Sequence, residues 1–445
     1  MIGQFYRAVW RWHFYAGFLT MPILVVLAVT GGLYLFKPEI HLLLYRDMIV
    51  VQPRDAAPAP ASALVAAAEA GLQGRVVQIT LPARRDRSAE ALVRVPDGTV
   101  RNAYIDPYDA KLLGSTVAGG TMQTIRNLHS LSLIGAWANA LVEIAAGWAI
   151  IMVFTGIYLW WPRGAPGGVL SIRGKPGQRL FWRDLHAVAG ILAGGVIVFL
   201  AVTGMPWSTF WGAKVQQWVA VSGLGAPSPP SGVTPRFLLT LPAGASSDHS
   251  HAAPRPWGLE KLPAPHSHNA RGHEIGIDAA AARFEALGVP KPYGLQPPES
   301  EKGAYAATHT PDRVEGIRLV YLDQYSGKLL SETRFADYGP AAKVIEWGIA
   351  VHQGLQYGEA NRLVMLAGCI AILVLAVSSV TMWWKRRPKG GLGIPPRGGR
   401  AEAYVVGAIA VVGLLYPLTG LSFVIAVVID LAATRLRQAR RSGLT

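Results

Sequence analysis

The sequence predicts an α-helical integral membrane protein. We expect four core transmembrane helices in a tandem pseudo-twofold repeat, a short C-terminal helical hairpin, and two small α+β domains outside the membrane. Three observations support this fold class. Hydrophobic residues form 51% of the 445-residue chain and charged residues only 16%, against roughly 25% charged in an average soluble domain. Several apolar runs are long enough to cross a bilayer. Two histidine-centred patterns each occur twice along the chain.

Basic residues are concentrated beside the apolar runs, which argues against a nucleic-acid partner. The formal net charge is +15, but a nucleic-acid-binding protein spreads its basic residues over a soluble face or tail. Here they mark the cytoplasmic side of a bilayer. They are Arg7, Arg11, Arg163, Arg173, Lys175, Arg179, Arg183, Lys385, Arg386, Arg387, Lys389, Arg397 and Arg400. The single cysteine, Cys369, lies in an apolar run and excludes an internal disulfide.

Four apolar runs have the length of about 20 residues that crosses roughly 30 Å of hydrocarbon. They cover 14–36, 140–161, 187–207 and 363–384. The first run exceeds the apolar core of a signal peptide, roughly 7 to 15 residues, so we interpret it as a retained anchor. A fifth stretch, 403–433, has basic residues on both flanks. This favours two short helices that turn back at Tyr416-Pro417 over a single crossing.

Successive helices then alternate in direction, which places both long polar segments outside and the N-terminus in the cytoplasm. The predicted organisation is helix 1–37, outside domain 38–125, helix 126–162, cytoplasmic loop 163–184, helix 185–207, outside domain 208–345, helix 346–385, cytoplasmic loop 386–402, and membrane hairpin with basic tail 403–445.

The two outside segments contain short alternating apolar runs with Pro and Gly between them, which is typical of small α+β domains. Each ends in a repeated motif, Tyr104 to Leu113 and Tyr321 to Leu330, in which six of ten residues are identical. In both copies an Asp is followed by turn-forming residues, so the motif predicts a β-hairpin.

The helices contain two internal repeats. The first and third helices share a His, a Gly four residues later and a Thr-Gly pair: His13, Gly17, Thr30-Gly31 and His186, Gly190, Thr203-Gly204. The second and fourth share a His, a Gly six residues later and a Trp pair: His129, Gly135, Trp160-Trp161 and His352, Gly358, Trp383-Trp384. Each pair of copies runs parallel, which predicts a pseudo-twofold axis along the membrane normal.

Such an axis brings His13 to His186 near the cytoplasmic side and His129 to His352 near the outer side. A single histidine at a helix end can simply lie in the wet headgroup region, but both helix types keep theirs in both copies. Two imidazoles are too few for zinc, which takes three or four protein ligands. They suit the two axial positions of haem and leave none open. We therefore expect two haem b groups with bis-histidine ligation.

Arginine residues precede two of these histidines by one helical turn. Arg126 and Arg183 lie three residues before His129 and His186, where they could pair with haem propionates; anchoring at the membrane interface explains them equally well. From His129 to Trp160 a continuous helix would measure about 46 Å, longer than the hydrocarbon core. The helix is therefore expected to break near Gly135, or His129 to lie at the outer mouth.

Together these residues resemble the PepSY-associated transmembrane helix family, which includes bacterial siderophore-iron reductases. The shared marks are Trp12-His13, Gly17, Thr30-Gly31, Leu128-His129, Thr155 to Arg163, Leu185-His186, Gly190, Thr203-Gly204, the hairpin at Asp323, His352 and Trp383-Trp384. The resemblance covers nearly the whole chain. It implies a multi-pass protein of the bacterial inner membrane with two periplasmic PepSY-like domains and two haem groups on His13, His129, His186 and His352.

Two positions depart from the family pattern. The fourth helix has Ser378-Ser379 and Thr381 where the second has Thr155-Gly156 and Tyr158, and Ala110 stands where the first hairpin would have Gly. Neither departure touches a proposed ligand.

These features predict an oxidoreductase that passes electrons across the bilayer to a ferric siderophore or other ferric chelate, without a catalytic residue beyond the haem groups. The cytoplasmic loops lack a Gly-rich dinucleotide fingerprint, so the donor is expected to be a cytoplasmic reductase or a membrane quinol. One alternative is a haem-free scaffold whose outside domains bind a peptide, a protease or a metal. Another is a di-haem reductase of copper or of a periplasmic redox protein.

A histidine-rich stretch in the second outside segment is a further candidate metal site. Its members are His249, His251, His266, His268 and His273. A solvated insertion without metal function is the alternative interpretation.

Overall fold

The computed structural model describes residues 2–162, 168–225, 255–259, 264–268, 273–389, 393–396 and 399–441. The chain forms two compact units. The helical unit comprises Met1–Leu35, Asn127–Lys214 and Arg362–Thr445, and the sheet unit comprises Phe36–Arg126 and Val215–Asn361. Both units are therefore assembled from segments that lie far apart in the sequence.

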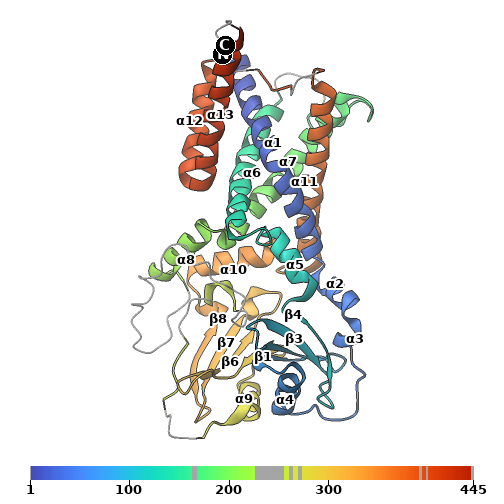
Figure 1. The fold of residues 1–445 in the computed structure, drawn as a ribbon, viewed down its shortest axis with the longest axis vertical. Coiled ribbons are helices and arrows are strands. Elements are labelled where there is room, and N and C mark those ends of the chain that lie inside the picture. The colour runs from blue at the N-terminus through green and yellow to red at the C-terminus, as the bar shows by residue number, and fades with distance from the viewer. Residues whose placement is uncertain are drawn as a thin grey trace. The chain divides into compact units, whose positions relative to one another are not determined.

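Four helices in the described part of the chain are long and apolar enough to cross a membrane. They are α1 (Ile2–Tyr34), α6 (Asn139–Trp160), α7 (Arg179–Gly204) and α11 (Gly358–Arg386) (Figure 1). Helices satisfy every interior backbone group within one segment, which hydrocarbon requires. By length and composition, the four predicted spans are confirmed.

His129 and His352, which belong to the second and fourth predicted helices, each end a short helix that precedes a long one. Helix α5 (Gly120–His129) ends at His129, and α6 begins only at Asn139 after a turn in which Gly135 has φ 136°. Helix α10 (Pro340–His352) ends at His352, and α11 begins at Gly358 with φ 62°. A positive φ favours glycine because it has no Cβ. The predicted break near Gly135 is confirmed.

The C-terminal segment forms a helical hairpin, as predicted. Helices α12 (Ala401–Leu415) and α13 (Pro417–Arg441) are separated at Tyr416, and Figure 1 shows them side by side. Their backbones meet at glycine: a Cβ on Gly420 would lie 2.6 Å from the Gly413 carbonyl oxygen. The hairpin packs on the other helices through Phe423, whose ring is 4.9 Å from that of Trp12 and 5.9 Å from that of Trp148.

The sheet unit holds one eight-stranded antiparallel sheet with the order β4-β3-β2-β1-β5-β6-β7-β8. The strands are β1 (Arg75–Leu81), β2 (Ala89–Arg94), β3 (Val100–Ile105), β4 (Leu112–Val117), β5 (Tyr293–Gln296), β6 (Ala304–His309), β7 (Arg318–Asp323) and β8 (Leu329–Arg334). The sequence predicts two separate domains, whereas the structure joins them where Thr80 of β1 pairs with Gly294 of β5. Pairing removes two exposed strand edges, each of which would otherwise present unpaired backbone groups.

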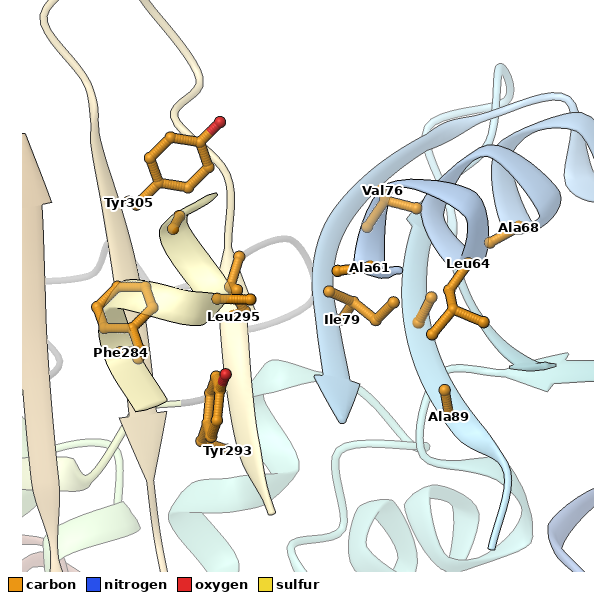
Figure 2. Close-up of a cluster of buried hydrophobic side chains, with 14 of the residues drawn as sticks. Ala61, Leu64, Ala68, Val76, Ile79, Ala89, Phe284, Tyr293, Leu295 and Tyr305 are labelled. Atoms are coloured by element: carbon orange, nitrogen blue, oxygen red, sulfur yellow. The ribbon is translucent and has the colours of Figure 1, made fainter. Parts of the chain in front are cut away.

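Each half of the sheet is covered by one helix. Helix α4 (Ala61–Leu72) packs Leu64 against β1, and α9 (Gly276–Ala286) packs Phe284 against β5, in one continuous cluster of buried side chains (Figure 2). A hydrogen bond from the Ser62 hydroxyl to Asp278 links the two helices at 2.5 Å. The remaining helices are α2 (Lys37–Leu44), α3 (Arg46–Ile49) and α8 (Trp211–Val221).

The two repeated motifs form hairpins with the same geometry, which confirms the predicted turn. The β3–β4 turn has Ala110 at φ 54°, and the β7–β8 turn has Gly327 at φ 64°. Both hairpins carry a register shift just before the turn, after Tyr104 and after Tyr321. The alanine that departs from the family pattern therefore adopts the left-handed conformation that glycine adopts in the second copy.

Candidate functional site

The structure brings His13 of α1 and His186 of α7 together within the helical unit. Their ring centroids lie 6.4 Å apart, and the ring planes are nearly perpendicular at 82°. The sequence predicts this pairing from the repeat alone. The two residues are separated by most of the first half of the chain, so it is the packing of α1 and α7 with α6 that makes them neighbours.

Each of these rings makes a hydrogen bond with a hydroxyl on a neighbouring helix. The His13 Nδ1 lies 2.9 Å from the Thr155 hydroxyl oxygen of α6, and that hydroxyl donates to the Ile151 carbonyl at 2.7 Å. A hydroxyl has one proton. With the hydroxyl proton assigned to the carbonyl, Nδ1 carries the ring proton and donates to Thr155. This tautomer leaves the Nε2 lone pair available for a metal ion.

The same arrangement recurs at two further histidines. The His186 Nδ1 lies 3.0 Å from the Ser378 hydroxyl, which donates to the Val374 carbonyl at 2.6 Å. The expectation that the departure at Ser378 touches no proposed ligand is therefore wrong. The His129 Nδ1 lies 2.9 Å from the Thr30 hydroxyl. That hydroxyl in turn donates to the Val26 carbonyl at 2.6 Å. With the same assignment, three of the four predicted ligands carry the ring proton on Nδ1. His129 and His186 also hydrogen-bond the backbone of Leu27 and of Leu375, respectively.

The ring centres of His13 and His186 lie 6.4 Å apart, a separation at which two imidazoles would both reach one metal ion with bonds of about 2.0–2.1 Å. Bis-imidazole ligation is an established haem coordination, and an outer partner on the second ring nitrogen is usual for metal-bound histidine. The residues present therefore fit haem.

His352 lies at the last residue of α10 in the sheet unit, and the Asn361 side chain donates to the neighbouring Val351 carbonyl at 2.9 Å. His129 belongs to the helical unit. The pairing of His129 with His352 stays a prediction.

Arg183 and Arg126, the two arginines expected to pair with haem propionates, differ in their contacts. Arg183 is half-exposed, and its guanidinium lies 2.6 Å from Asp184, a fully buried carboxylate that also pairs with Arg173 at 2.8 Å. Sequence reasoning missed Asp184, although an acidic residue among five basic ones was a visible signal. Arg126 lies on α5 one turn before His129. A contact of either arginine with haem stays a prediction.

A second buried polar cluster links α1 to the C-terminal hairpin. Arg11 forms ion pairs with Asp430 of α13 and, at 3.3 Å, with Glu402 of α12. The Tyr15 hydroxyl donates to Asp430 at 2.8 Å. Ionisable groups among apolar helices are costly unless they are paired. The cluster therefore fixes the hairpin against α1, close in sequence to His13.

The histidine-rich stretch is only partly described. His266, His268 and His273 are exposed, while His249 and His251 lie outside the described residues. Among the residues that are described, no three His, Cys, Asp or Glu side chains come close enough to hold a metal ion. Of the described histidines, His268 is attached to the β7–β8 turn, where its backbone N–H donates to Asp323 at 2.9 Å.

Four apolar helices that hold a neighbouring pair of partly buried histidines, together with an antiparallel sheet unit, define a multi-span membrane protein with a candidate cofactor site. The family model of the PepSY-associated TM region matches residues 10–386, and the chain belongs to this family. Comparison with curated proteins gave no significant match. Helices α12 and α13 lie beyond the matched residues.

Proposed function

We propose that this protein is a di-haem oxidoreductase of the bacterial inner membrane that passes electrons outward to a ferric chelate, releasing ferrous iron. The observation that carries the proposal is the neighbouring pair of His13 and His186, each with Nδ1 within hydrogen-bond distance of a hydroxyl on another helix. Bound haem supplies reversible one-electron transfer, with a potential tuned by its ligands and surroundings.

The sequence repeat supports the proposal of a second haem. His129 and His352 occupy equivalent positions in the two copies of the second helix type, and a pseudo-twofold axis would make them the counterpart of the His13 pair. In this arrangement the first pair lies near the cytoplasmic side and the second near the periplasm. The two halves of the sheet are then periplasmic PepSY-like domains.

The chain's own contribution is positioning and ligation. Two imidazoles would hold the haem and leave no open position, which would favour electron transfer over binding of oxygen. Reduction loosens an oxygen-rich ferric chelate such as a siderophore because ferrous iron carries less charge and is softer. The electrons enter from a cytoplasmic reductase or a membrane quinol, since the cytoplasmic loops carry no dinucleotide fingerprint.

The test is a visible spectrum of the detergent-purified protein, oxidised and reduced, with haem quantified per chain. Two low-spin b-type haems per chain are expected. Protein without haem, made in cells that supply it, would overturn the proposal and leave the scaffold alternative. Reduction of a ferric siderophore, compared with reduction of a copper complex and of a periplasmic redox protein, would then identify the acceptor.

Single histidine substitutions test the pairing. His13→Ala or His186→Ala should each remove one haem equivalent and leave the other spectrum intact, while His129→Ala or His352→Ala should remove the second. The matched control is His41→Ala, because His41 is not a proposed ligand and its Nε2 hydrogen-bonds the Tyr104 hydroxyl at 2.8 Å. Loss of both haems from any single change would contradict the pairing.

A further inference from the structure

We infer that the hydroxyl residues Thr155, Ser378 and Thr30 are positioning residues that fix the tautomer and orientation of the haem-ligating histidines and thereby set haem affinity and reduction potential. The inference rests on the proposed function. It assigns a role to Thr30-Gly31 of the helix repeat and to Thr155-Gly156, which the ligand assignment alone leaves unexplained.

The hydroxyls come from a different helix in each case. Thr155 on α6 serves His13 on α1, Ser378 on α11 serves His186 on α7, and Thr30 on α1 serves His129 at the end of α5. Each hydroxyl is held by a bond to its own helix, four residues back. The acceptor is therefore rigid, and the position of each ring depends on how two helices pack.

The glycine that follows two of the threonines leaves room for the ring. A Cβ on Gly156 would lie 3.4 Å from the His13 Cε1, and a Cβ on Gly31 would lie 3.2 Å from the His129 Cε1. A Thr-Gly pair thus supplies a hydrogen-bond acceptor for the histidine ring and, at the next residue, the space that the ring occupies. At the third site the space-giving glycine is replaced by Ser379, whose hydroxyl donates to the Ala376 carbonyl at 2.8 Å, while Ser378 keeps the acceptor.

The acceptor also affects the metal. A hydrogen bond accepted from Nδ1–H increases the basicity of the ligating imidazole, and loss of such a partner typically costs about 10–100-fold in metal affinity. A more basic ligand stabilises the ferric form. Removing the acceptor should therefore raise the reduction potential of the haem at that site and weaken its binding.

The experiment compares Thr155→Val, which keeps the side-chain volume, with Thr155→Ser, which keeps the hydroxyl. Thr155→Val should weaken binding of one haem about 10–100-fold and raise its midpoint potential in a redox titration of the purified protein. Thr155→Ser should restore both values. Ser378→Ala and Ser378→Thr form the equivalent pair at the partner histidine.

Thr20→Val is the matched control. Thr20 is buried in α1 and donates to the Ala16 carbonyl at 2.8 Å, but within the described residues its hydroxyl bonds no histidine. The haem content and midpoint potentials of the Thr20→Val variant should equal those of the wild type. Unchanged affinity and potential in Thr155→Val, with two haems in the wild type, would overturn the positioning role alone. A wild type without haem would contradict both the inference and the proposed function.

Discussion

Buried polar groups are satisfied differently in the two units. In the sheet unit, the Asp323 carboxylate accepts backbone N–H groups from His268, Tyr325 and Ser326, all within 3.0 Å. In the helical unit, the hydrogen bonds that the described residues make to the His13 ring involve Nδ1 only. The Asp323 carboxylate receives these hydrogen bonds from backbone groups of its own chain, which indicates a structural role. His13 keeps one nitrogen for an external group, which is what a ligand site requires.

The largest expected effect on folding comes from removing Asp323. Asp323→Ala leaves three backbone N–H groups without their acceptor in a position only 4% exposed, and we expect a loss of about 2–4 kcal/mol in the free energy of unfolding. Thermal unfolding of the full chain in detergent, with haem per chain measured in parallel, tests this. The haem of the His13 pair should stay in place, because His13 and His186 belong to the helical unit and Asp323 to the sheet unit. Loss of that haem would remove the distinction between the two kinds of polar group.

Asp323 should also make the stability of the folded protein depend on pH. Burial raises the pKa of the Asp323 carboxyl, but backbone hydrogen bonds from His268, Ser326 and Tyr325 lower it more, so its pKa lies below the usual range. A depressed folded-state pKa gives stability that is present above the unfolded value of about 3.9 and is lost as the pH falls through the folded value. The difference in melting temperature between wild type and Asp323→Asn should therefore shrink on acidification. A constant difference would contradict this.

A smaller effect is expected at the histidine site of the helical unit. Gly31→Ala places a methyl group 3.2 Å from the His129 Cε1, so the ring must shift by a few tenths of an ångström. Overpacking costs about 1–3 kcal/mol, partly offset by the higher helix propensity of alanine. We expect reduced occupancy of one haem. Gly195→Ala is the control, because a Cβ there meets nothing within 4 Å. Equal haem content in both variants would show that the space is not needed.

The smallest expected effects on stability come from substitutions in the turns of the two hairpins. Ala110→Gly should stabilise the sheet unit by about 0.5–1 kcal/mol, since alanine is strained at φ 54°. Gly327→Ala should destabilise it by a similar amount for the same reason, at φ 64°. The measurement is the midpoint of thermal unfolding. Shifts of the same sign in both variants would contradict the equivalence of the two turns.

The sequence predicted those features that depend on local pattern. Apolar length identified the four spans, the Asp-centred repeat identified both hairpins, and the excess length between His129 and Trp160 identified the break at Gly135. Each of these depends on residues close together in the chain, where helix rise and turn chemistry are sufficient.

Apart from the pairing of His13 with His186, which the repeat predicted, features that depend on packing between distant segments were missed. The Thr155 hydroxyl is 142 residues from His13, and Ser378 is 192 residues from His186. Repeat spacing indicated that Thr-Gly pairs recur but not what they contact. The β1–β5 pairing was equally invisible, because an edge strand and a central strand have similar composition when both faces are buried.

The joined sheet has a consequence for biogenesis. Strand β1 pairs with β5, which begins at Tyr293, more than 200 residues after Leu81 ends β1. At a synthesis rate of about 5–20 residues per second, the ribosome needs about 10–40 s to make the intervening chain, including α6 and α7. During that time the nascent first half carries an open strand edge of the kind that templates aggregation. Prolonged pausing of translation between β1 and β5 should therefore lower the yield of folded protein more than pausing after β8.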